Sequence, residues 1–296
     1  MLSEKRRPYT FSAVLAAFMA AQSLLGLLFQ QAYHYPEGAA PAWLGNDLIT
    51  LIIAVPLLIT GMSLARRGSI RGLLLWLGVL AYSALNYAHY LFGATLNAFF
   101  LLYVVALALC VAALVVLPAR IDAPSVATGF GAKTPARTIG AYFVLLGAGF
   151  FAAWTGIWGT HVFAAWPTPV EAESFKSIIA VDIMTLVPAL VLGGVLLWRH
   201  RAWGYLLAPS AGIATSLYLL VLTANSYVAF MLGIPIRLGE WTVWGGLLVV
   251  TVAASGVLLW SARAKDQHGQ ARGKHTRRER PGASPRSHSP ADTPTE

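Results

Sequence analysis

The chain has 296 residues, of which 57% are apolar and only 11% are charged. Soluble domains carry about 25% charged residues, so this composition excludes an ordinary water-soluble fold. The formal net charge of +9 could suggest nucleic-acid binding, but 19 of the 21 Lys and Arg residues lie in the N-terminal segment, in every second connector or in the C-terminal tail. That distribution is typical of membrane orientation, so we expect the lipid bilayer as partner and no nucleic acid.

The apolar residues form runs of about 20, the length that crosses a hydrocarbon core of about 30 Å as a helix. The first apolar run continues to Phe29, longer than the apolar region of about 7–15 residues in a signal peptide, and its removal would break the alternation of basic connectors, so we expect it to be a retained helix. The sequence therefore predicts an all-α bundle of about eight transmembrane helices. The predicted spans are residues 11–29, 47–65, 72–91, 96–117, 139–158, 178–198, 204–232 and 241–260.

The connectors between these runs alternate between basic and non-basic. Arg67 lies in the connector after the second span and Arg199 in the connector after the sixth, whereas the alternate connectors contain only Lys176 and Arg237 as basic residues. Lys and Arg favour the cytoplasmic side of short loops. We therefore expect a multi-pass protein of the cell (inner, cytoplasmic) membrane, with the N and C termini on the cytoplasmic side.

The chain divides by composition into residues 1–262, a transmembrane domain, and residues 263–296, a basic tail. The tail is rich in Arg, Ser, Pro and Gly and has almost no large apolar residue, so we expect it to be disordered. Two interpretations of its charge remain: contact with anionic lipid headgroups, or a solvated tail. Cys110 stands alone in an apolar run, which excludes an intramolecular disulfide and is typical of a packing residue.

The two halves of the predicted bundle share a pattern. When the sequence is shifted by 132 residues, prolines, glycines and arginines of the second and third spans fall on those of the sixth and seventh. The matching pairs are Pro56 and Pro188, Gly61 and Gly193, Arg67 and Arg199, and Gly72 and Gly204. The pattern predicts two four-helix repeats of parallel orientation; the alternative is coincidence among helices that are rich in Gly and Pro.

The stretch Leu196 to Ala208 reads LLWRHRAWGYLLA, and Asp182 and Pro188 precede it. This segment resembles one in uncharacterised multi-spanning bacterial integral membrane proteins. The resemblance covers mainly the sixth and seventh spans. It implies a helical membrane fold and no particular activity.

Two carboxylates lie within or beside predicted spans. A carboxylate near the centre of a membrane helix costs about 2.5 to 3.5 kcal/mol, so Asp182 needs partners in the bundle. We expect its face, with Thr185, Ala189 and Gly193, to point at other helices; the alternative is that a hydroxyl, an amide or water satisfies it. Asp47 begins the second predicted span, where it could instead be a helix N-cap.

Further polar residues lie near the same, non-cytoplasmic ends of the spans, which predicts a polar pocket that opens outwards. The candidate pocket residues are Asp47, Asn86, His89, Tyr90, His161, Asp182 and Asn225. His titrates near neutrality, so a carboxylate and an imidazole there could exchange protons with a substrate. Two Asp and two His could also hold a divalent metal, although no HExxH spacing is present. An isolated His in such a place is more often an interfacial residue.

Three functions are compatible with this pattern. The first is a small-solute or ion transporter, coupled to protons through Asp182 and His89. The alternatives are a non-catalytic membrane subunit, sensor or assembly factor, and a membrane-embedded enzyme with an Asp/His site, which we consider less favoured. The sequence identifies no cofactor, substrate or oligomeric state.

The predicted orientation can be tested with reporter fusions. A fluorescent reporter that matures only in the cytoplasm should be active when fused after Arg67 or after Arg199, because both positions lie in basic connectors. The same reporter fused after Glu173 should be inactive. A silent reporter after Arg67, at normal expression, would contradict the predicted topology.

Overall fold

The computed structural model describes residues 2–33, 40–234 and 239–262. Eight of its helices are long and apolar enough to cross a membrane, which confirms the predicted all-α bundle. The helices are α1 (Leu2–Leu28), η1 (Gln30–Tyr33), α2 (Ala40–Ile49), η2 (Thr50–Ala54), α3 (Val55–Arg66), α4 (Ile70–Gly93), α5 (Phe100–Val116), η3 (Pro118–Arg120), α6 (Ala123–Ala127), α7 (Ala136–Ala164), α8 (Ala172–Val181), η4 (Asp182–Leu186), α9 (Val187–Trp198), α10 (Gly204–Met231) and α11 (Glu240–Ser261). The tail 263–296 lies outside the described residues, so its disorder and lipid contact stay predictions.

The second and sixth spans each begin six residues earlier than predicted. The second runs from Pro41 to Arg66, and the sixth runs from Ala172 to Trp198. Their first turns include polar residues, such as Glu173, which a search for apolar runs leaves out. The predicted start at residue 178 would place Asp182 about one helical turn inside its span. Because α8 begins at Ala172, Asp182 instead lies about 15 Å from the beginning of the span, at 1.5 Å per residue.

Each of these two spans is interrupted at the same relative position by a π-helical turn, η2 in the first and η4 in the second. In η2 the N–H of Val55 donates to the carbonyl oxygen of Thr50, five residues back, and the equivalent residues of η4 do the same. Pro56 and Pro188 follow immediately. Because proline has no N–H and its ring clashes with the carbonyl four residues back, a wider turn relieves the helix there.

The turns that follow also correspond. Gly68 (φ 80°) and His200 (φ 54°) adopt the left-handed conformation that ends each helix. The next helix then approaches closely: a Cβ at Gly72 or at Gly204 would lie 2.6 Å or 2.3 Å from a backbone nitrogen of the preceding helix. All these positions differ by 132 residues, so the structure supports the predicted repeat.

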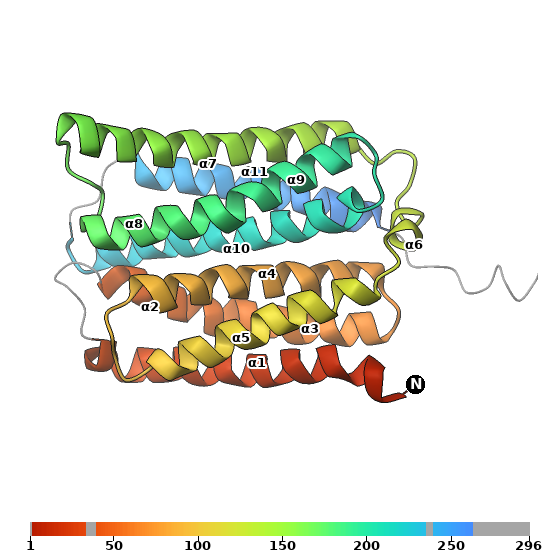
Figure 1. The fold of residues 1–296 in the computed structure, drawn as a ribbon, viewed down its shortest axis with the longest axis horizontal. Coiled ribbons are helices and arrows are strands. Elements are labelled where there is room, and N and C mark those ends of the chain that lie inside the picture. Colours follow the sequence, from red (N-terminus) through yellow and green to blue (C-terminus); the bar gives the residue numbers. More distant parts are fainter. Residues whose placement is uncertain (1, 34–39, 235–238, 263–296) are drawn as a thin grey trace, which may run out of the picture. The chain divides into compact units, whose positions relative to one another are not determined.

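The two halves, α1 to α5 and α7 to α11, lie side by side (Figure 1). Their third spans, α4 and α10, are the most deeply buried and pack against each other. The contacts between the halves are reciprocal, since α2 packs on α10 and α8 packs on α4. This exchange is the expected arrangement of two parallel repeats related by an axis along the membrane normal.

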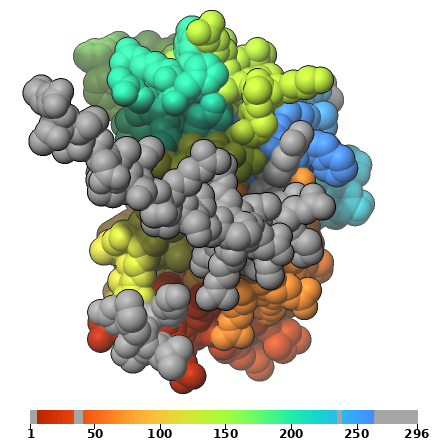
Figure 2. Space-filling view, turned by 90° about the vertical axis from the view of Figure 1, so that its right-hand side faces the viewer, coloured from red at the N-terminus to blue at the C-terminus, as the bar shows by residue number. Residues whose placement is uncertain are grey.

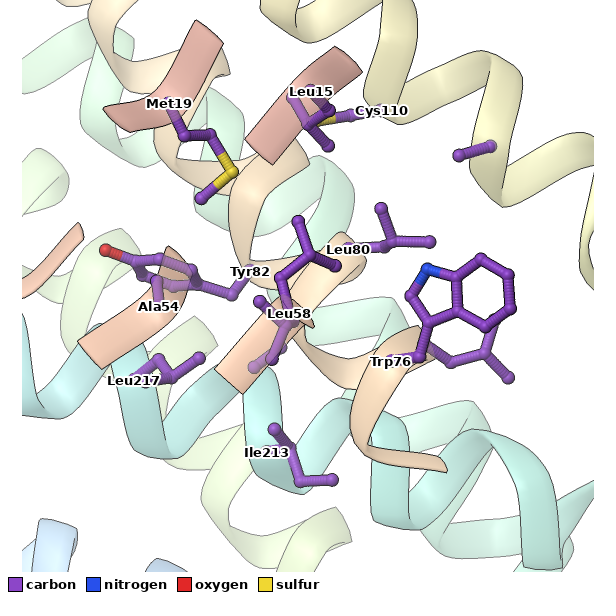
Figure 3. Packing of buried hydrophobic residues seen from close by; sticks show 14 of the residues in the cluster. Leu15, Met19, Ala54, Leu58, Trp76, Leu80, Tyr82, Cys110, Ile213 and Leu217 are labelled. Atoms are coloured by element: carbon purple, nitrogen blue, oxygen red, sulfur yellow. The ribbon is translucent and has the colours of Figure 1, made fainter. Parts of the chain in front are cut away.

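The apolar core of the first half extends to α10 of the second (Figure 3). Leu58 of α3, Leu80 of α4 and Leu217 of α10 are almost fully buried there. Trp76 fills the space beside α1, and its Nε1 donates to Oγ of Ser12 at 2.9 Å. Cys110 is also fully buried in this cluster, as expected of a packing residue.

A second link between the halves lies at the end of the bundle that Figure 2 faces, where the α3–α4 and α9–α10 turns lie. Nε of Arg71 donates to the carbonyl oxygen of Ala262 at 2.7 Å, and Nη2 donates to that of Trp260 at 3.0 Å. The guanidinium also lies over the Trp260 ring. Because the carbonyls at a helix C-terminus lack partners and carry partial negative charge, Arg71 fixes the end of α11 to α4.

We predict that the close approach at the repeat turns is needed for stability. Gly204→Ala should lower the free energy of unfolding by about 1–3 kcal/mol, because its Cβ would meet backbone rather than a flexible side chain. Gly149→Ala on α7, where a Cβ would meet nothing within 4 Å, is the control. Thermal unfolding in detergent, followed by tryptophan fluorescence, measures both; equal melting temperatures for the two variants would refute the prediction.

Candidate functional site: two buried carboxylate centres

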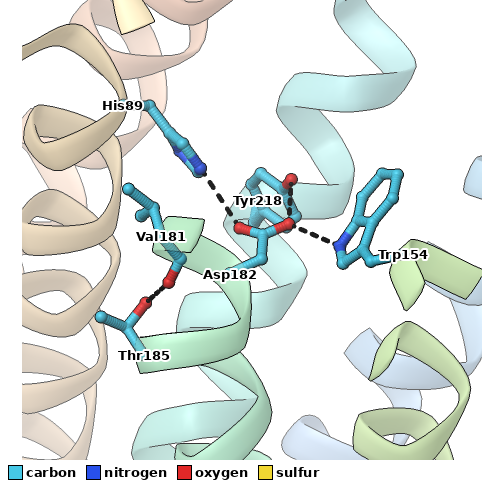
Figure 4. Close-up of polar contacts among 6 residues, drawn as sticks. All are labelled: His89, Trp154, Val181, Asp182, Thr185 and Tyr218. Atoms are coloured by element: carbon cyan, nitrogen blue, oxygen red, sulfur yellow. Dashed lines mark hydrogen bonds and ion pairs between the residues drawn. The ribbon is translucent and has the colours of Figure 1, made fainter. Parts of the chain in front are cut away.

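The carboxylate of Asp182 is fully buried at the start of η4 (Figure 4). Its Oδ2 accepts hydrogen bonds from Nε1 of Trp154 at 2.9 Å and from the hydroxyl of Tyr218 at 2.8 Å. These donors come from α7 and α10, which belong to the same half of the bundle as Asp182. Neutral donors therefore satisfy one oxygen. The alternative interpretation of the sequence expected a hydroxyl, an amide or water to do this, and the Tyr218 hydroxyl is such a partner.

The other oxygen of Asp182 faces the opposite half. Nε2 of His89, on α4, lies 3.2 Å from Oδ1, within ion-pair distance, and both atoms are buried without a hydrogen bond. The His89 side chain is 12% exposed, and its ring stacks on that of Tyr218 at 5.7 Å between centroids. This contact becomes an ion pair when the imidazole is protonated. The pair thus joins the two halves by a contact whose strength depends on one proton.

The π-helical turn changes which face of the sixth span is buried. Because of the wider turn, Leu186 and Leu190 are buried on the same side of the helix as Asp182. Thr185 and Ala189 are exposed. The Thr185 hydroxyl instead donates to the carbonyl oxygen of Val181 at 2.6 Å, within its own helix (Figure 4). The predicted face is therefore wrong at Thr185 and Ala189, because it assumed an uninterrupted α-helix, whereas Gly193 is buried against Ala208 of α10 as expected.

Asp47 forms a second centre in the first half, and it is also fully buried. Its Oδ1 accepts from Nε2 of Gln22 at 2.9 Å and from the hydroxyl of Tyr90 at 2.8 Å. Its Oδ2 accepts a short hydrogen bond from the hydroxyl of Tyr33. Gln22 in turn accepts from the Tyr87 hydroxyl at 3.2 Å. Every donor in this network is uncharged.

The interpretation of Asp47 as a helix N-cap is wrong. Helix α2 begins at Ala40, and the carboxylate of Asp47 binds side chains rather than backbone N–H groups. Gly26 on α1 allows this approach, since a Cβ there would lie 2.2 Å from Oδ2 and 2.1 Å from the Tyr33 hydroxyl. The sequence placed the helix start at the first apolar run and so missed the preceding turn.

The two centres correspond in the repeat. Gln22 and Trp154 stand 132 residues apart, and each donates to the carboxylate of its own half. Thr50 occupies the position equivalent to Asp182, and there Nδ2 of Asn86 lies 3.4 Å from the Thr50 hydroxyl. One repeat position thus carries a hydroxyl in the first half and a carboxylate in the second.

The remaining candidates lie apart from these carboxylates. Asn225 faces the start of α2, where its amide nitrogen, in the orientation that satisfies its surroundings, lies 3.3 Å from the carbonyl oxygen of Pro41. Nδ1 of His161 lies 2.7 Å from the carbonyl oxygen of Trp166, within the same turn of chain. No group of three or more His, Cys, Asp and Glu side chains that could hold a metal occurs among the described residues.

Four residues that donate directly to the two carboxylates were missing from the predicted pocket: Gln22, Tyr33, Trp154 and Tyr218. Gln22 could have been found because it is a polar residue inside an apolar run. The 132-residue repeat then indicates Trp154, which stands at the equivalent position of the second half. Tyr218 could have been found in the same way, because it is the repeat equivalent of Asn86. Tyr33 lies in the short helix η1 between spans and gave no comparable signal.

Comparisons with protein-family models, with curated proteins and with solved structures found no match for this chain. The eight apolar helices fit a multi-pass membrane protein in contact with a lipid bilayer. Any more specific function must therefore be argued from the chemistry of the two carboxylate centres.

The hydrogen bond from Trp154 can be tested against a matched tryptophan on the same helix. Trp154→Phe should destabilise the protein by about 1.5–3 kcal/mol, the usual effect of losing a hydrogen bond to a charged group. Trp158→Phe, whose ring is half exposed, should change stability little. Thermal unfolding in detergent distinguishes them, and a melting temperature unchanged in Trp154→Phe would show that Asp182 does not need this donor.

Proposed function

We propose that this chain is a transporter for a small solute or ion, and that the Asp182–His89 pair couples transport to proton movement. We further propose that the N terminus, the C terminus and the basic connectors that contain Arg67 and Arg199 face the cytoplasm. The observation that carries the proposal is the 3.2 Å contact between Nε2 of His89 and Oδ1 of Asp182, inside the apolar spans and across the two halves. Ionisable residues inside membrane spans are costly and typically mark the pathways of substrates or protons.

The pair has the chemistry that proton coupling requires. With a protonated imidazole facing an ionised carboxylate, the two halves attract each other, and the low dielectric of the bundle strengthens that attraction. A further proton on Asp182 removes its negative charge, and loss of the proton from His89 removes the positive one. Either change weakens the contact between α4 and η4, so protonation biases the separation of the halves.

The architecture favours transport for a second reason. Many transporters consist of two repeats with the binding site at their interface, formed where helices are interrupted. Here η2 and η4 interrupt equivalent helices, and η4 begins at Asp182 itself. π-Helical turns are frequent at functional sites because they turn a side chain out of the regular helical pattern. The enzyme alternative has less support, since its metal-assisted form lacks a ligand cluster in the described part of the chain.

We predict that both members of the pair are needed for flux. Proteoliposomes on a solid-supported membrane can be challenged with amino acids, sugars, organic acids and inorganic cations, each with and without a pH gradient. At least one solute should evoke a current that depends on the gradient. Asp182→Asn and His89→Gln should each reduce that current roughly tenfold or more, because neither variant can carry the proton.

Glu173→Gln provides the matched control, because Glu173 lies on α8 in an exposed pair with Lys176. Its current should equal that of the unaltered protein. Size-exclusion profiles establish that each variant is folded. A full current from folded Asp182→Asn would contradict the proposed coupling.

A further inference from the structure

The Asp47 centre differs from the Asp182 centre in one respect: no cation faces it. In the described part of the chain no Lys, Arg or His side chain forms an ion pair with Asp47. The ionisable groups in contact with it are the hydroxyls of Tyr33, on η1, and Tyr90, on α4. Gln22 faces it from α1, and α10, which packs on α2, places the amide of Asn225 at the start of α2 and not at the carboxylate.

The neighbours of Asp47 nevertheless match those of Asp182. In each half the carboxylate accepts one hydrogen bond from the first helix, from Gln22 or from its repeat equivalent Trp154. It accepts another from a tyrosine on the third span, Tyr90 or Tyr218. In the repeat frame Asp182 lies three residues after Asp47, which is close to one helical turn and keeps both on the same face. Each half of the protein therefore contains one carboxylate with the same type of support.

The size of the Asp47 centre restricts what it can bind. The side chains are packed so closely that a single Cβ at Gly26 would overlap both the carboxylate and the Tyr33 hydroxyl. A metal ion or an organic cation would require these groups to move apart. A proton fits without displacing any heavy atom, because it adds no heavy atom to the centre.

We propose that Asp47 binds and releases a proton, so that the protein has one proton site in each half. On protonation Oδ2 becomes a donor to the Tyr33 oxygen, and the Tyr33 O–H rotates away from the carboxyl group. The proton comes from the surrounding water and forms one O–H bond at Oδ2, so the net charge of the centre changes from −1 to zero and no other covalent bond forms or breaks. A role for this proton in transport rests on the proposed function, whereas the binding of the proton does not.

The direct test is infrared difference spectroscopy of the full chain in phosphatidylcholine liposomes, titrated from about pH 9 to about pH 4, the range that covers ordinary and buried carboxyl groups. A protonated carboxyl group has a C=O stretching band that the ionised form lacks. One such band should appear as the pH falls, be absent in Asp47→Asn, and remain in Asp182→Asn. In Tyr33→Phe the same band should shift in frequency, because its hydrogen-bond partner is gone.

The outcomes are distinct from those of the flux experiment. A titrating band that is lost in Asp47→Asn supports the proposal even when no solute is transported. If Asp47→Asn does not fold, the shift of the band in Tyr33→Phe, with Trp158→Phe unchanged, identifies the group instead. A spectrum in which neither substitution alters any titrating band means that Asp47 stays in one state throughout, and this would overturn the proposal.

Discussion

A carboxylate surrounded by hydrocarbon must obtain its hydrogen-bond donors from the protein, and this requirement organises the bundle. Water is absent from the bilayer core, and each unsatisfied polar group there costs several kcal/mol. Asp47 and Asp182 are both fully buried, and each draws donors from helices that are distant in sequence. The donors fix α1 and α4 around one carboxylate and α7 and α10 around the other. The polar centres therefore specify how otherwise uniform apolar helices are arranged.

The repeat provides the scaffold on which these centres differ. Interruptions, tight turns and glycine contacts recur at equivalent positions, because they depend on backbone geometry that both halves share. The side chains at the centres do not recur: Thr50 stands where Asp182 does, and Gln22 where Trp154 does. Among the described residues, an imidazole from the other half lies within ion-pair distance of Asp182 and none does so for Asp47. The symmetry of the backbone and the asymmetry of the polar groups together give two centres with different charge partners.

Much of the architecture could be predicted from the sequence, because hydrocarbon length and the position of arginines are strong and local signals. The eight spans and the repeat are of this kind. The details of the centres were less accessible. The buried face of the sixth span was misassigned at Thr185 because a π-helical turn leaves no clear mark in the sequence beyond the following proline. The predicted single pocket placed Asp47 and Asp182 together, yet the side chains that contact them form separate networks, because helix packing is not determined by the periodicity of the sequence.

Helix α4 connects the two networks, and this gives the arrangement a mechanical consequence. His89 and Tyr90 are consecutive residues, so their side chains leave the helix about 100° apart. The first contacts Asp182 in the other half, and the second donates to Asp47 in its own half. Rotation or translation of α4 must therefore alter both contacts together. Helix α4 also holds the end of α11 through Arg71, so it contacts the second half near both of its own ends. A change of charge at either carboxylate therefore acts on the helix that joins the two halves.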